Sequence, residues 1–80
     1  MTDLQARNLK VGDMILFYDR RGFDKQYHLY AEEVKGITYG VDMGLVLKNN
    51  GNHARIDWFS EEVNVMYPIG HYIWENIEKV

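Results

Sequence analysis

The stretch GLVLKNNGNHARIDWF, residues 44–59, constrains the fold of this chain more than any other segment. Two apolar-rich runs flank a central Asn-Asn-Gly-Asn sequence, with Leu45 and Leu47 alternating with Val46 before it and Ala54, Ile56 and Trp58 alternating with polar residues after it. Alternation with a period of two is typical of strands with one buried face. The Asn50-Gly51 pair suits the positive φ angles of a type I′ or related tight turn. These features predict a β-hairpin whose core face is formed by Ala54, Ile56 and Trp58.

Shorter segments on either side of the hairpin predict further strands. Residues 14–18 are almost continuously apolar, as in a strand that is covered on both faces. Residues 63–67 alternate again, and residues 71–80 leave room for one turn of 3₁₀ helix and a final short strand. Residues 1–8 are polar, so we expect them to be loosely ordered.

Residues 24–35 fit either a short helix or a strand. Four residues with apolar bodies recur at the spacing of one helical face, namely Tyr27, Tyr30, Ala31 and Val34. In that case Asp24 would be the N-cap and Gly36 the C-terminal stop of the helix. A strand would place Leu29 on the shared face but Val34 on the opposite one. The helical pattern fits slightly better, and both interpretations remain open.

The composition bounds the class of protein. Eighty residues make one domain, and a hydrophobic fraction of 46% is too high for a disordered chain. There is no cysteine, so neither a disulfide nor a thiolate ligand is available. No apolar run approaches the ~18 residues of a membrane span, and the polar first residues lack the apolar region of a signal peptide. We therefore expect a soluble protein of a reducing cytoplasm.

The residues needed for catalysis or metal binding form no recognisable pattern. The single serine, Ser60, lies in an acidic turn, where negative neighbours oppose the charge that develops on an attacked carbonyl. The histidines are far apart in the sequence, and His28 and Glu32, four residues apart, are expected to form an ordinary pair on a solvated face. Neither glycine-rich phosphate-binding motif is present. We therefore expect no enzymatic activity, no metal and no cofactor.

The strongest candidate for partner binding is the segment RRGFDK, residues 20–25, which combines three cations with one aromatic ring. Arginine and aromatic side chains are common anchors at protein interfaces, and they also grip nucleic-acid backbones and stack on bases. The ordinary alternative is a solvated turn whose Phe23 folds back onto the body of the domain. Near the C-terminus, two further rings either line a surface groove or belong to the core. The candidate partner-binding residues are Arg20, Arg21, Phe23, Lys25, Tyr72 and Trp74.

Four short motifs occur in an order that resembles small SH3-like barrel proteins encoded by tailed bacteriophages. They are Val11-Gly12-Asp13, Gly44-Leu45-Val46-Leu47, Arg55-Ile56-Asp57-Trp58 and Glu75-Asn76-Ile77-Glu78-Lys79-Val80. The resemblance implies a mainly β fold over residues 1–80, a small five-stranded SH3-like barrel with a short helix or an elaborated loop around residues 20–43. Because the family largely lacks assigned roles, no catalytic residues carry over.

The resemblance and the candidate residues together predict a non-enzymatic binding module, namely a phage accessory protein that contacts a host or viral protein in the host cytoplasm. Two alternatives stay open, and neither involves a membrane. A virion or assembly component would form a homo-oligomer through an apolar patch. A nucleic-acid-binding barrel is disfavoured by the net charge of −3. It would require one face to carry Arg20, Arg21, Lys25, Lys48 and Arg55.

Overall fold

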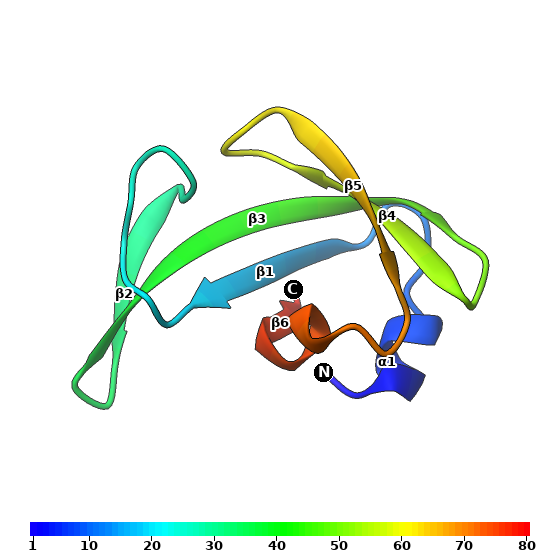
Figure 1. The fold of residues 1–80 in the computed structure, drawn as a ribbon, viewed down its shortest axis with the longest axis horizontal. Coiled ribbons are helices and arrows are strands. Elements are labelled where there is room, and N and C mark those ends of the chain that lie inside the picture. The colour runs from blue at the N-terminus through cyan, green and yellow to red at the C-terminus, as the bar shows by residue number, and fades with distance from the viewer.

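The computed structural model describes all residues from 1 to 80 and is mainly β (Figure 1). Its elements are α1 (Asp3–Arg7), β1 (Met14–Asp19), β2 (Tyr30–Val34), β3 (Ile37–Asn49), β4 (His53–Trp58), β5 (Val63–Pro68), the 3₁₀ helix η1 (Tyr72–Asn76) and β6 (Ile77–Lys79). The strands pair antiparallel in the order β5-β4-β3-β1-β6, and β2 pairs with β3 off this path. The chain thus has six strands rather than the expected five, and the end strands β5 and β6 do not pair with each other.

The long strand β3 organises the sheet, because it pairs with three other strands. β1 lies along one edge of β3, while β2 and β4 follow one another along the opposite edge. Pairing with β2 extends to Val41 and pairing with β4 starts at Gly44, so the partner changes at Asp42 and Met43. Figure 1 shows the result: β3 runs the length of the molecule, with the β2–β3 hairpin at one end and the β3–β4 hairpin at the other.

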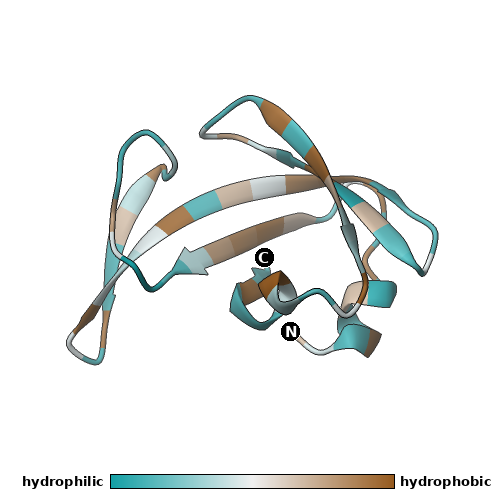
Figure 2. Cartoon of the chain, viewed as in Figure 1, coloured by the Kyte–Doolittle hydropathy of each residue, from teal (hydrophilic) through white to brown (hydrophobic).

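The strands differ in hydropathy. Figure 2 shows β1 as nearly continuously apolar, whereas polar residues interrupt the apolar ones along β3 and β5. On β4 the buried side chains belong to Ala54, Ile56 and Trp58, which confirms the predicted core face of the hairpin. The core is completed by residues from the other elements and from the loop after α1, namely Ala6, Leu9, Ile15, Val46, Trp74 and Ile77.

The loop of the β3–β4 hairpin is held by asparagine side chains rather than by a type I′ turn. Of its central residues only Gly51 has a positive φ, of 87°. The Gly51 N–H donates to Asn49 Oδ1 at 2.9 Å, and Asn50 Oδ1 accepts from the N–H groups of Asn52 at 2.9 Å and His53 at 2.8 Å. Short side chains that bond to the backbone two residues further on replace the backbone turn here.

Residues 1–8, for which a loose terminus was expected, contain the short helix α1. Thr2 and Gln5 form a capping box at the start of α1, with each side chain bonded to the other's backbone N–H. At the other end of the helix, the side-chain amide of Asn49 donates to the carbonyls of Ala6 at 3.0 Å and Leu9 at 2.9 Å. The asparagine-rich hairpin therefore holds the N-terminal segment against the core.

The segment from residue 24 to residue 36 is a turn followed by the strand β2, so of the two interpretations left open the strand is confirmed for residues 30–34 and the helix is wrong. One helical turn forms, because the N–H groups of Tyr27 and His28 both donate to the Asp24 carbonyl at 2.9 Å. The chain then extends into β2, and Lys35 (φ 52°) and Gly36 (φ 80°) connect β2 to β3. Positive φ at both central residues is the type I′ pattern. Pairing with β3 outweighs the helical spacing of the tyrosines.

The C-terminal segment confirms the predicted 3₁₀ turn and final strand. His71 precedes η1, and its Nδ1 accepts a hydrogen bond from the Ile73 N–H at 3.1 Å. β6 follows at once and pairs with β1. Neither α1 nor η1 has the length and apolar character that a membrane-crossing helix requires.

We predict that Gly44→Ala lowers the free energy of unfolding by about 1–3 kcal/mol, because the core is already filled at this position. A Cβ at Gly44 would lie 2.6 Å from Cγ2 of Ile56 and 3.0 Å from the Trp58 indole. Urea denaturation measures the difference. Thr38→Ala, at an exposed position of the same strand, should change the free energy by less than about 0.5 kcal/mol. Equal stability of Gly44→Ala and the wild type would contradict the prediction.

Candidate functional site

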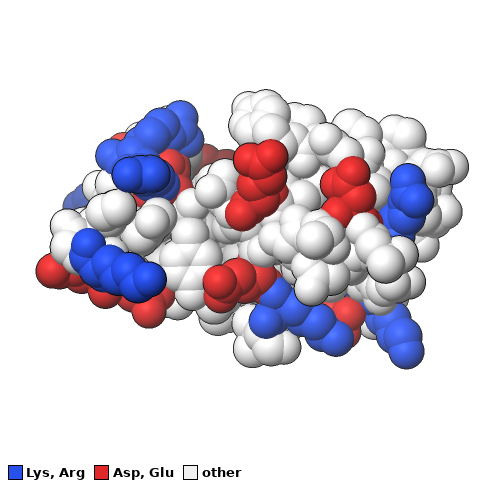
Figure 3. Space-filling model, turned by 90° about the horizontal axis from the view of Figure 1, so that it is seen from below, with Lys and Arg blue, Asp and Glu red and all other residues white.

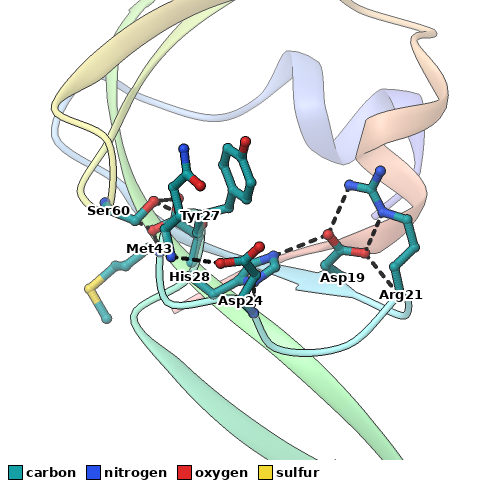
Figure 4. A network of polar contacts seen from close by, with 9 residues as sticks. Asp19, Arg21, Asp24, Tyr27, His28, Met43 and Ser60 are labelled. Carbon is teal, nitrogen blue, oxygen red and sulfur yellow. Dashed lines mark hydrogen bonds and ion pairs between the residues drawn. The ribbon is translucent and has the colours of Figure 1, made fainter.

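A network of polar side chains lies where the loop after β1 folds back over the sheet (Figure 4). Asp19, the last residue of β1, is buried at its centre. Arg21 donates to both carboxylate oxygens, from Nε to Oδ1 at 3.0 Å and from Nη2 to Oδ2 at 2.9 Å. These bonds hold the pKa of Asp19 below its usual range, although burial of the carboxylate acts in the opposite direction. Asp19 is therefore a charged anchor for the loop.

His28 is the second buried member of the network, with 6% of its surface exposed. Its Nε2 lies 3.0 Å from Asp19 Oδ2, and its Nδ1 accepts from the Asp24 N–H at 3.0 Å. Because Nδ1 acts as an acceptor, the hydrogen-bond pattern assigns the ring proton to Nε2, which donates to Asp19. The expected solvated pair of His28 with Glu32 is therefore wrong. Both ring nitrogens are engaged, so the imidazole is not free to act as a base.

Gly40 on β3 makes room for this packing. A Cβ at Gly40 would lie 2.6 Å from the Gly22 carbonyl oxygen and would collide with the His28 ring. Gly40 is also the cross-strand partner of Asp19. The loop can therefore pack on β3 at this point only because the strand carries no side chain there.

A second group of polar contacts lies where β3 changes partners. Asp42 is 5% exposed, and its Oδ1 accepts from the N–H groups of Met43 at 2.8 Å and Ser60 at 3.2 Å. The Ser60 hydroxyl oxygen lies 2.6 Å from Asp42 Oδ2 and 2.8 Å from the Tyr27 carbonyl oxygen. Ser60 thus has a carboxylate and a carbonyl as its partners rather than an imidazole. These contacts link the loop, β3 and the β4–β5 turn.

The loop held by this network borders a surface groove of about 560 Å³ between the end of β1 and η1. The groove is lined by Phe17, Tyr18, Asp19, Arg20, Arg21, Tyr67, His71, Tyr72, Ile73 and Asn76. Tyr72 is the most exposed large hydrophobic side chain of the protein, at 74%. Its ring stacks on the His71 imidazole with the centroids 4.4 Å apart. The groove thus combines two arginines with an exposed ring that is held in place by stacking.

The structure brings together three of the six predicted partner-binding residues, because Arg20, Arg21 and Tyr72 line the same groove. Phe23 and Lys25 are exposed on the same loop but do not line it. The assignment of Trp74 to a binding surface is wrong. Its side chain is in the core, with 1% exposed, and its Nε1 donates to the Pro68 carbonyl at 3.0 Å.

Two lining residues, Tyr67 and His71, were not singled out from the sequence. Tyr67 lies near the end of β5 and His71 immediately before η1. Their ring centroids are 5.7 Å apart. No local pattern marks either residue, since their contact depends on the bend between β5 and η1.

The lysine and arginine side chains do not form one continuous surface patch. Figure 3 shows lysines and arginines interspersed with acidic side chains on the face it presents. Arg20 follows Asp19, which pairs with Gly40, whereas Arg55 pairs with Lys48. Gly40 and Lys48 are eight residues apart on β3, which corresponds to about 26 Å along a strand. The cations that a nucleic-acid site would need therefore fall into two groups at opposite ends of the sheet.

No group of three or more His, Asp or Glu side chains is placed to hold a metal ion. Comparison with known proteins finds no matching protein family, no similar curated protein and no similar solved structure.

We predict that Asp19→Asn lowers the free energy of unfolding by about 2 kcal/mol at pH 7, because it removes a buried charge from its hydrogen-bonded partners. The folded-state pKa of Asp19 is depressed. Its contribution is therefore complete above the unfolded pKa, near pH 4, and is lost as the pH falls through the folded value. The stability difference between wild type and variant should shrink below about pH 4.

Urea unfolding at pH 7, pH 5 and pH 3 measures this difference. Asp57→Asn is the matched control, since Asp57 is a half-buried carboxylate on β4 that forms no ion pair. It should cost less than Asp19→Asn at pH 7. A gap between wild type and Asp19→Asn that stays constant on acidification would contradict the role assigned to the carboxylate.

Proposed function

We propose that the protein is a non-enzymatic binding module of the SH3-like type, and that it serves a tailed phage as an accessory protein that contacts a host or viral protein. The strand order supports the fold in this proposal. β1 pairs with both β3 and the last strand β6, and a 3₁₀ turn precedes β6. β2 is then an elaboration of the loop between β1 and β3. The short motifs along the sequence support the phage assignment.

The observation that carries the binding role is the exposed ring of Tyr72 beside Arg20 and Arg21. Tyrosine and arginine are enriched among the residues that dominate binding energy at protein interfaces. A ring already held by stacking on His71 loses little conformational freedom when a partner covers it. Aromatic grooves of this kind bind extended peptides in SH3-type domains.

The charge of the groove favours a partner segment that contains Asp or Glu. Arg21 is engaged by Asp19, whereas Arg20 forms no ion pair within the protein. Arg20 is therefore free to pair with a carboxylate of the partner, and the bidentate geometry of a guanidinium suits that contact. The engaged nitrogens of His28 and the structural bonds of Ser60 support a role in binding rather than in catalysis.

The two alternatives receive less support. The cations divide between the two ends of the sheet, which does not favour a continuous nucleic-acid surface. An assembly component would use an unpaired sheet edge or an apolar patch, and β2 is paired along one edge only. Full antiparallel overlap of two copies of β2 would, however, place Glu32 opposite Glu32, which is unfavourable.

We predict that Arg20→Glu and Tyr72→Ala each reduce capture of the protein partner at least about tenfold, because each removes a central contact of the groove. Affinity capture from nuclease-treated host lysate with the tagged chain, quantified by mass spectrometry, measures the recovery. Lys48→Glu makes the same charge change at the far end of the sheet and should retain the partner. A partner that disappears with nuclease, or that both groove variants capture normally, would rule out this groove as the protein-binding site.

A further inference from the structure

A second groove, of about 350 Å³, lies between the β2–β3 hairpin and the C-terminal segment. It is lined by Tyr18, Val34, Tyr39, Glu75, Asn76 and Glu78. The rings of Tyr18 and Tyr39 meet edge to face, with the centroids 6.0 Å apart and an interplanar angle of 89°. Two aromatic rings therefore form one wall of a groove whose other lining is apolar at Val34 and acidic or polar at Glu75, Asn76 and Glu78.

The acidic side chains around this groove have no cationic partner within the protein. The ion pairs of the structure join Arg21 to Asp19, His28 to Asp19 and Lys79 to Asp13, so none of them contains a glutamate. Lys79 follows Glu78 in the chain, but its Nζ lies 3.6 Å from Asp13 instead. The groove therefore carries uncompensated negative charge beside its aromatic wall.

A third glutamate, Glu32 of β2, adds to this charge. It is the cross-strand partner of Tyr39, so the two side chains lie on the same face of the hairpin. Burial, followed by the negative charges of Glu32 and Glu78, raises the pKa of the Tyr18 phenol. The negative charges of Glu32 and Glu78 thus act on Tyr18 from two different strands, β2 and β6.

We propose that this second groove binds an arginine or lysine side chain of an extended, basic peptide segment. A cation over a tyrosine face is attracted by the ring quadrupole, and the glutamates supply carboxylate acceptors for its N–H groups. β2 borders the groove through Val34, and β2 pairs with β3 alone, so its other edge is free. An extended segment can pair its backbone with that edge while one side chain enters the groove. An acidic segment is repelled by the same charges.

This inference does not rest on the proposed function. The first groove has a cationic rim and favours an acidic partner, whereas the second has an acidic rim and favours a basic one. Tyr18 and Asn76 line both grooves. The variants that test the second groove therefore leave these two residues unchanged.

The first experiment titrates the ¹⁵N-labelled full chain with the peptide acetyl-(Gly-Arg)₄-amide and follows the backbone amide chemical shifts. The comparison peptide, acetyl-(Gly-citrulline)₄-amide, has the same shape without the charge. We expect the largest shifts at Val34, Tyr39 and Glu78, and an affinity at least about fivefold higher for the arginine peptide. Equal affinity for both peptides, or shifts confined to the residues around Tyr72, would overturn the proposal.

The second experiment repeats the titration with two double variants of equal net charge. Glu32→Gln with Glu78→Gln should weaken binding of the arginine peptide at least about fivefold, because two carboxylate contacts are lost. Glu61→Gln with Glu62→Gln removes the same charge from the exposed β4–β5 turn and should change the affinity less than about twofold. Equal weakening by both pairs would show that only net charge attracts the peptide, and would overturn the proposal.

Tyr39→Leu provides an independent test of the aromatic wall. It keeps an apolar side chain but removes the ring, so the arginine peptide should bind about threefold more weakly. The amide spectrum of each variant without peptide reports whether the fold is intact. Unchanged affinity in a folded Tyr39→Leu variant would contradict the aromatic contact.

Discussion

β3 pairs with β2 at one end of the sheet and with β4 at the other. Its backbone N–H and C=O groups therefore need other hydrogen-bond partners at the residues between these two pairings. Between Val41 and Gly44 neither β2 nor β4 pairs with it. A buried N–H or C=O group left without a partner costs about 1–3 kcal/mol. At Met43 the N–H donates to Asp42 Oδ1, and the C=O accepts from the Phe59 N–H. The buried carboxylate of Asp42 therefore allows one continuous strand to carry two hairpins along the same edge.

The same carboxylate begins the chain of contacts that fixes the loop after β1. Asp42 binds Ser60, whose hydroxyl also reaches the Tyr27 carbonyl. His28 follows in the sequence and returns the loop to Asp19 at the end of β1. The loop is thus tied at both ends, so its backbone is held in place before any partner arrives. Ordering in advance lowers the entropic cost of binding, so the packing of the sheet and the binding surface depend on the same contacts.

Local sequence patterns predicted the elements that depend on neighbouring residues alone, including the β3–β4 hairpin and the final 3₁₀ turn. The β2–β3 hairpin was not predictable in this way, because its type I′ turn uses Lys35-Gly36 instead of the favoured Asn-Gly or Asp-Gly. Thr2 and Gln5 have the spacing of a capping box in the sequence, but the polar residues around them indicated a loosely ordered terminus. The site was less predictable still. Asp19 and His28 are nine residues apart and meet only because the loop turns inward over Gly40.

The glutamates of β2 affect both the self-pairing of this strand and the kind of segment that can bind beside it. A strand with one open edge tends to pair with further strands, and charged side chains commonly prevent this. Two copies of β2 would oppose their own carboxylates, whereas a basic segment would compensate them. The side chains that discourage self-pairing therefore select a basic partner. We propose an acidic segment as the partner of the groove beside Arg20, and Tyr18 lines both grooves. A single extended partner that engaged both grooves would therefore have to change from acidic to basic as it passes Tyr18.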